Sequence, residues 1–251
     1  FLEPLKPWFS KLKLRYSQGL VGSDYANNRW LYMSEFSKDG NGHIVEDKIA
    51  NSSVQWEQAM KRDLGIEMGF LNDELHLSVD LFDEKRTNML VEPNVTMLVG
   101  TSYKEVNRGS MKKHGIDIEL GWNDRTKSGF NYHLTALLSL NENRITNYED
   151  APYAPDYQKV AGKAYMGQTG GMSVVDSGYY ENVNDIHNYP AYSDNWLYVN
   201  IGSYKYLDYA VDGSLNSQDL HAIAGSQYPP VSCSFRGGFE YKGLEFNMLW
   251  T

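Results

Sequence analysis

The stretch Leu75 to Asp83, "LHLSVDLFD", alternates between apolar and polar residues along its whole length. Successive side chains of a β-strand point to opposite faces, so the apolar residues of this stretch would share one face and the polar residues the other. The pattern therefore predicts a two-faced β-strand. Alternation by itself leaves open whether the apolar face turns toward a core or toward something outside.

Six more stretches show the same alternation, at 11–17, 62–70, 114–122, 130–140, 233–241 and 244–250. Together with 75–83 they predict seven antiparallel strands. The segment 53–65 begins like a helix at Ser53, but the alternation that sets in by Leu64 favours the upper part of a strand.

The connections between these strands are of two kinds that strictly alternate. Short turns lie at 71–73, 123–129 and 242–243, whereas the other three connections have about 45, 30 and 90 residues. All short turns would then lie at one end of the sheet and all long loops at the other. Soluble domains seldom hold such long connections, whereas outer-membrane β-barrels combine short turns with long outer loops.

Composition narrows the functional class. The 251 residues carry a net charge of −9, which argues against a nucleic-acid partner, and the single cysteine, Cys233, gives neither a disulfide nor a metal-binding spacing. The histidines have no metal-ligand spacing, and no nucleophile elbow or phosphate-binding loop occurs, so we expect no enzymatic activity.

Two architectures fit the alternation. In a soluble sandwich or barrel the apolar face packs inside; in a membrane barrel it meets lipid and the polar face lines a wet lumen. The loop asymmetry favours the membrane barrel, and so do aromatic residues near the strand ends, where membrane barrels have interfacial girdles. These residues are Phe70, Trp122, Phe130, Tyr241 and Trp250. The predicted lumen-facing charges are Lys13, Arg15, Asp63, Glu67, Asp80, Asp117, Glu119, Arg236 and Glu240.

An ordered series of segments resembles the C-terminal barrel region of SusC/RagA-type TonB-dependent transporters. The segments are "LKLRYSQGLVGS" (12–23), "WEQAMKRDLGIEMGFLNDELHLSVDLFDEKRTNML" (56–90), "NRGSMKKHGIDIELGW" (107–122), "SLNENRI" (139–145), "DYAVDGSLNSQDLHAIAGSQYPP" (208–230) and "FRGGFEYKGLEFNMLW" (235–250). No single motif is decisive, but the series covers nearly the whole chain.

The resemblance implies an all-β fold, with residues 1–251 forming about seven strands of a 22-stranded transmembrane barrel in a bacterial outer membrane. The plug domain and the N-terminal strands would lie outside this chain. The resemblance also implies TonB-dependent import of glycans or peptides, with a SusD-like surface lipoprotein as a lid. The alternative that we retain is a soluble β-rich carbohydrate-binding module.

The longest loop is rich in aromatic residues that could stack on sugar rings or hold a peptide backbone. We expect substrate contacts from Tyr165, Tyr180, Trp196 and Tyr198. An equally open interpretation is that these aromatics pack the loop against itself.

Residues 208–219 have the spacing of a twelve-residue calcium loop. Its predicted ligands are Asp208, Asp212, Ser214, Asn216 and Asp219, with Gly213 at the sharp bend. Transporters of the resembled type commonly carry a fuller form, Asp-x-Asn-x-Asp-Gly, and here Ala210 removes one ligand. Calcium is therefore the one cofactor considered, against the alternative of an acidic turn without metal.

Overall fold

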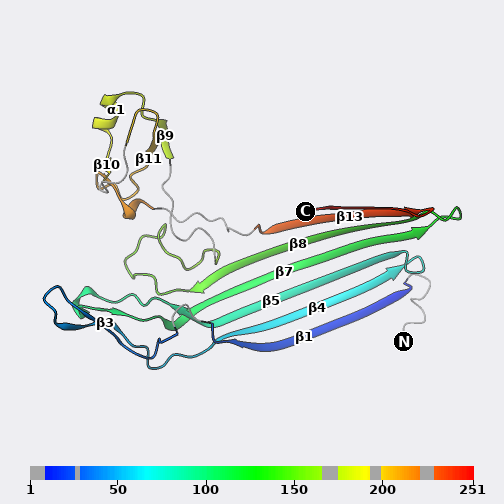
Figure 1. The fold of residues 1–251 in the computed structure, drawn as a ribbon, viewed down its shortest axis with the longest axis horizontal. Coiled ribbons are helices and arrows are strands. Elements are labelled where there is room, and N and C mark those ends of the chain that lie inside the picture. Colours follow the sequence, from blue (N-terminus) through cyan, green and yellow to red (C-terminus); the bar gives the residue numbers. More distant parts are fainter. Residues whose placement is uncertain (1–8, 26–28, 166–174, 193–198, 221–228) are drawn as a thin grey trace. The chain divides into compact units, whose positions relative to one another are not determined.

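The computed structural model describes residues 9–25, 29–165, 175–192, 199–220 and 229–251. Its main element is a seven-stranded antiparallel sheet with the strand order β1-β4-β5-β7-β8-β13-β14 (Figure 1). The strands are β1 (Lys11–Ser23), β4 (Glu57–Phe70), β5 (Leu75–Val91), β7 (Val106–Arg125), β8 (Asn131–Asn147), β13 (Val231–Tyr241) and β14 (Leu244–Trp250). The predicted all-β fold with seven strands is confirmed, and 57–70 is a strand rather than a helix.

The short elements lie in the connections. They are β2 (Glu35–Lys38), β3 (Ile44–Ile49), η2 (Met97–Val99), β6 (Ser102–Tyr103), β9 (Val175–Tyr179), α1 (Val183–Asn188), β10 (Ala191–Tyr192), β11 (Tyr204–Tyr206), β12 (Ser214–Leu215) and η3 (Ser217–Asp219). Strands β2, β3 and β6 form a separate three-stranded sheet. No helix within the described ranges is both long and apolar enough to cross a membrane.

Tight turns close one end of the seven-stranded sheet. Between β13 and β14, Lys242 and Gly243 both have positive φ, 51° and 83°, as a two-residue hairpin turn requires. The β4–β5 turn at Leu71, Asn72 and Asp73 also has positive φ throughout, and Thr126 N–H bonds Phe130 C=O in the β7–β8 turn. The three long connections all leave from the opposite end of the sheet, as the sequence predicts.

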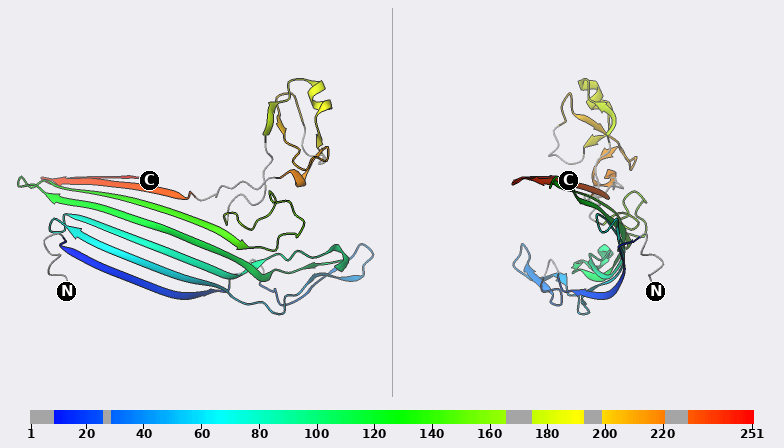
Figure 2. Two further views of the ribbon diagram at one scale, coloured as in Figure 1. Left: turned by 180° about the vertical axis from the view of Figure 1, so that it is seen from behind. Right: turned by 90° about the vertical axis from the view of Figure 1, so that its right-hand side faces the viewer.

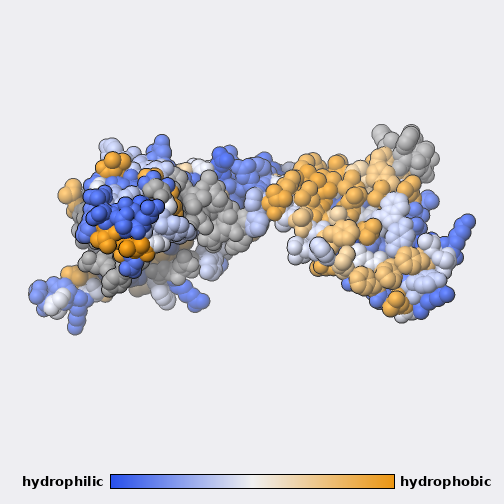
Figure 3. All heavy atoms as spheres, turned by 90° about the horizontal axis from the view of Figure 1, so that it is seen from above, coloured by the Kyte–Doolittle hydropathy of each residue, from blue (hydrophilic) through white to orange (hydrophobic). Residues whose placement is uncertain are grey.

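The sheet is curved (Figure 2), with one convex and one concave face. Apolar side chains gather on the convex side (Figure 3), and many are well exposed, such as Leu14 at 70%, Leu81 at 46% and Leu120 at 44%. No second layer of described residues covers Ile116, Ile118 or Leu120. We call this convex side the outward face and the polar concave side the inward face.

A small apolar core lies at the loop end of the sheet. Its buried members are Leu31, Met89, Val91, Met111 and Ile145. Beside it the buried Lys104 donates through Nζ to the Trp30 carbonyl at 2.7 Å and pairs with Glu35 at 2.9 Å. Residues 29–51 are thereby tied to the segment that leads into β7.

The chain divides into two compact units, one of residues 1–149 with 229–251 and one of residues 150–228. The second unit contains α1, the antiparallel pair β9–β11 and the parallel pair β10–β12. Its largest fully buried side chain is that of Tyr180, at 2% exposure.

Candidate functional site

Arg15 reaches across a neighbouring strand on the inward face. In the register, Arg15 lies opposite Gly65 of β4, and Gly65 lies opposite Asp80 of β5. Arg15 Nη2 bonds both Asp80 carboxylate oxygens, at 2.7 and 2.9 Å. A Cβ on Gly65 would collide with Asp80 Oδ1 and come within 2.9 Å of Arg15 Cζ. Glycine is therefore the residue that lets this ion pair cross β4.

The Glu67 carboxylate forms ion pairs with three cations at the same edge of the sheet. Its carboxylate lies 2.9 Å from Lys11 Nζ, 3.1 Å from Lys13 Nζ and 3.2 Å from Arg15 Nε. These are β1 residues on one face, so the carboxylate fixes the charged side of β1 against β4.

The centre of the inward face places two carboxylates side by side. Asp80 and Asp117 are direct cross-strand partners, an arrangement that like charges make unfavourable. Arg15 offsets the charge of Asp80, and Ser139 Oγ donates to Asp117 Oδ1 at 2.5 Å. The nine predicted lumen-facing residues all occupy inward positions, and six are acids against three cations. This wall suits water and ions rather than acyl chains.

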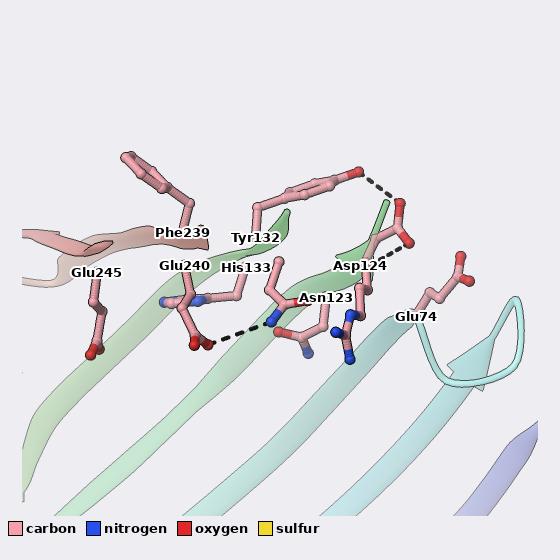
Figure 4. A pocket seen from close by; sticks show the side chains of 10 residues that line it. Glu74, Asn123, Asp124, Tyr132, His133, Phe239, Glu240 and Glu245 are labelled. Carbon is pink, nitrogen blue, oxygen red and sulfur yellow. Dashed lines mark hydrogen bonds between the residues drawn. The ribbon is translucent and has the colours of Figure 1, made fainter. Parts of the chain in front are cut away.

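A cavity of about 750 Å³ lies at the turn end of β7, β8, β13 and β14 (Figure 4). Asn131 Nδ2 donates to Glu240 Oε2 at 3.4 Å, and Glu245 lies opposite Glu240 across the hairpin. Within the described chain, Asn131 Oδ1 and His133 Nε2 are buried without a hydrogen-bond partner. Polar groups with spare bonding capacity thus line the inward side of this end.

On the outward side of the same strands the side chains are aromatic. Tyr132, Phe239 and Phe246 are successive cross-strand neighbours, and the Phe130 ring stacks on Phe239 at 5.3 Å between centroids. Tyr132 OH donates to Asp124 at 3.0 Å. Four of the five predicted girdle aromatics lie at this end, whereas Trp250 pairs with Phe235 farther along the strands.

The sheet thus has an apolar outer face with an aromatic rim at its turn end and an acid-rich inner face. A family model described as "TonB dependent receptor-like, beta-barrel" matches residues 3–220. The chain belongs to this family.

Named relatives agree with this assignment. The chain is 22% identical over 258 residues to TonB-dependent receptor P26 of Formosa agariphila, covering 96% of this chain and 25% of the relative. It is 21% identical over 251 residues to TonB-dependent receptor SusC of Bacteroides thetaiotaomicron, covering 95% of this chain and 24% of the relative. The chain therefore spans about a quarter of the length of these receptors.

A solved structure shares the fold. It is described as the structure of the RagAB peptide transporter, with a TM-score of 0.63 and 20% identity, and the match covers 96% of this chain and 26% of that chain. The predicted fold of a TonB-dependent barrel segment is confirmed by this likeness and by the family match.

The structure gives the predicted substrate-binding aromatics different settings. Tyr180 is buried, its ring meets Tyr189 edge-on at 5.6 Å, and burial raises the pKa of its hydroxyl. Tyr165 is partly buried, and Trp196 and Tyr198 lie outside the described residues. For Tyr180 the geometry favours the packing interpretation; cargo contact by these residues stays a prediction.

An exposed aromatic pair next to Tyr180 is not among the four predicted substrate contacts. Tyr179 and Tyr204, on β9 and β11, stack at 4.7 Å between centroids and are 53% and 46% exposed. The hydrogen bond between their hydroxyls raises the pKa of Tyr179. Sequence alone could not separate Tyr179 from Tyr180, because only the β9–β11 register shows which ring turns outward.

The 208–219 loop is a closed network of carboxylates and backbone amides. Asp208 accepts the N–H groups of Asp212 and Gly213, at 3.2 and 2.8 Å. The buried Asp219 accepts those of Ala210 and Asn216, at 2.9 and 2.7 Å. This bonding is what the acidic-turn interpretation requires.

The remaining predicted ligands of the loop also bond within it. Asp212 Oδ1 accepts the Ser214 N–H at 2.8 Å, and Asn216 Nδ2 donates to Asp212 Oδ2 at 3.3 Å. No group of three or more His, Cys, Asp or Glu residues placed to hold a metal ion occurs in the described part of the chain. Calcium binding here stays a prediction.

Proposed function

We propose that this chain forms part of the wall of an outer-membrane β-barrel that imports glycans or peptides with energy supplied through TonB. Cargo would bind at the long-loop end, beneath a SusD-like surface lipoprotein, and would cross through the lumen bounded by the inward face. The barrel wall itself would perform no covalent chemistry.

The observation that carries the proposal is the chemistry of the two faces. A soluble β-rich module has to bury its apolar face, whereas here the apolar residues are on the convex side and the ion pairs on the concave side. In a membrane barrel this is the favourable arrangement, since lipid surrounds the outside and water fills the bore.

The proposed cargo rests on other observations. The structural relative RagAB is described as a peptide transporter, which supports peptide as one class of cargo. The exposed Tyr179–Tyr204 pair offers flat faces suited to sugar rings as well as to peptide groups. Both cargo classes therefore belong to the proposal.

Fractionation of cells that produce the intact transporter tests the membrane assignment. We expect the protein in the outer-membrane fraction, extracted only by detergent, with a mobility on unheated gels that changes after boiling. Recovery in the soluble fraction without detergent would instead support the soluble carbohydrate-binding module.

Uptake of labelled oligosaccharides and labelled peptides tests the transport function. Uptake of one class should require both this protein and TonB, and deletion of the proposed SusD-like lipoprotein should reduce it. Uptake that persists without TonB would contradict the proposed mechanism.

Calcium in the 208–219 loop is a separate proposal that calorimetric titration of the refolded barrel tests. Heat of binding that disappears in Asp208→Asn would support it, and the absence of heat at millimolar calcium would end it.

A further inference from the structure

On β5, β7 and β8 the outward apolar surface ends toward the long-loop end of the sheet. The last row that is apolar on all six contributing strands consists of Tyr16, Leu64, Leu81, Ile116, Leu140 and Val231. The next outward row consists of Gln18, Arg62, Asp83, His114 and Glu142. The change from apolar to polar takes place within two residues on each of these strands, and only β1 and β4 return to apolar residues in the row after that, with Leu20 and Met60.

One row farther on, three cations lie directly opposite one another. Lys85 of β5 pairs in register with Lys112 of β7, which pairs with Arg144 of β8. We call these three residues the basic row. Such cross-strand partners have Cβ atoms about 4.5–5.5 Å apart, and like charges at this spacing repel each other.

The basic row is only partly neutralised within the described chain. Arg144 pairs with Glu142 at 2.9 Å, and its side chain is still 63% exposed. The side chains of Lys85 and Lys112 are exposed, and no hydrogen bond or ion pair joins either ammonium group to another described residue. The ammonium groups are therefore free to take an external anion, which would relieve their repulsion.

The two edges of the apolar surface are chemically different. Between the row at Leu81 and the tight turns, the outward positions of the described strands contain no Lys or Arg. The turn-end edge has the aromatic neighbours Tyr132, Phe239 and Phe246 and one acid, Asp124. Exposed cations that merely kept the protein soluble would not need to be confined to one edge.

We infer that the basic row binds the phosphate of a membrane-lipid headgroup whose acyl chains lie on the apolar surface below it. Lysine and arginine beside an apolar surface are the groups that recognise anionic lipid headgroups. The inference rests on the proposed membrane function and adds to it a lipid of stated chemistry in the leaflet at the long-loop end. An anion free in solution would satisfy the charges but would make no use of the adjoining apolar row.

The test compares two double variants of the intact transporter in detergent. K85Q/K112Q removes two charges from the outward face, whereas K61Q/K113Q removes two charges from the inward face, where Lys61 and Lys113 flank Glu84 in the register. Binding of diphosphoryl lipid A and of its dephosphorylated form is measured by native mass spectrometry. A heat-dependent gel shift for each variant verifies that the barrel is folded.

We expect K85Q/K112Q to weaken binding of the diphosphoryl lipid about 30-fold and to leave binding of the dephosphorylated lipid unchanged. K61Q/K113Q should bind both lipids like the unmodified protein. Equal binding of the diphosphoryl lipid by both double variants would overturn the inference, as would full competition by millimolar inorganic pyrophosphate. A transporter that needs no detergent and shows no gel shift would refute the membrane function itself, which is a separate outcome.

Discussion

At the scale of single residues, Gly65 is the position where a side chain is excluded by an ion pair. An added methyl group would meet Asp80 Oδ1 and the Arg15 guanidinium. We expect Gly65→Ala to lower the free energy of unfolding by about 2 kcal/mol. The loss has two causes: the added methyl group overpacks the site, and it weakens an ion pair that solvent already partly screens. Urea-dependent folding into lipid vesicles measures this change.

Gly19 provides the control for this prediction. It lies on β1, again at an inward position, but a Cβ there would have no atom within 4 Å. Gly19→Ala should be neutral or stabilise the strand by about 0.5–1 kcal/mol. Equal effects at the two glycines would mean that the Arg15–Asp80 crossing does not constrain β4.

Tyr180 is the residue on which the packing of residues 150–228 depends most. Its backbone N–H and C=O bond Ser203 and Gly202, and its ring is 2% exposed. Tyr180→Ala should destabilise this unit by about 3–5 kcal/mol, the usual cost of deleting a buried aromatic ring. Tyr153→Ala, at a residue 98% exposed, should stay within about 0.5 kcal/mol. Hydrogen exchange of the Gly202 amide reports the loss, and equally slow exchange in Tyr180→Ala would contradict it.

At the scale of elements, the sequence predicts the turn ends of the strands to within three residues, the largest difference being β7, which ends at Arg125 rather than 122, but it does not predict their loop ends. Strand β5 begins at Leu75 as predicted, yet it continues to Val91 rather than ending at 83, and β7 begins at Val106 rather than 114. The reason is that outward positions beyond Leu81 carry charge, so the apolar alternation stops while the backbone pairing continues. A bulge near Met89, with Asn88 at φ 57°, hides the pattern further.

The stability of helix α1 should depend on pH through Asp185. The Glu181 backbone N–H, and then Lys205, hold the pKa of the Asp185 carboxyl below its usual value of 3.8. A lowered pKa means that the unfolded segment binds protons more readily, so the stabilisation is complete above the usual pKa and is lost as pH falls through the lowered one. We expect the protection factors of the α1 amides, which compare each exchange rate with that of the unfolded chain at the same pH, to fall as the pH drops below about 4. Asp185→Asn should remove this dependence; the same acid response in the variant would assign it to another group.

At the scale of the whole molecule, the architecture was more readily predicted than the sites. Alternation and loop length both follow from strand geometry, and they indicated a barrel wall before any side-chain position was known. The aromatic loop gave no comparable signal, because neighbouring tyrosines such as Tyr179 and Tyr180 differ in burial only through tertiary packing. The burial of Asp219 also could not be predicted, because it depends on hydrogen bonds that its carboxylate accepts from the backbone of its own loop.

Two neighbouring leucines of β8 test which face of the wall meets lipid. Leu137 and Leu138 are similarly exposed, at 40% and 36%, but they point to opposite faces of the sheet. If the outward face lies in the bilayer, Leu138→Arg should cost about 2–4 kcal/mol of folding free energy in lipid vesicles, because Ile118 and Cys233 beside it belong to the apolar surface. Leu137→Arg, beside Glu119 on the wet side, should cost less than about 1 kcal/mol. A larger penalty at Leu137 would place water on the convex side and reverse the arrangement from which transport is inferred.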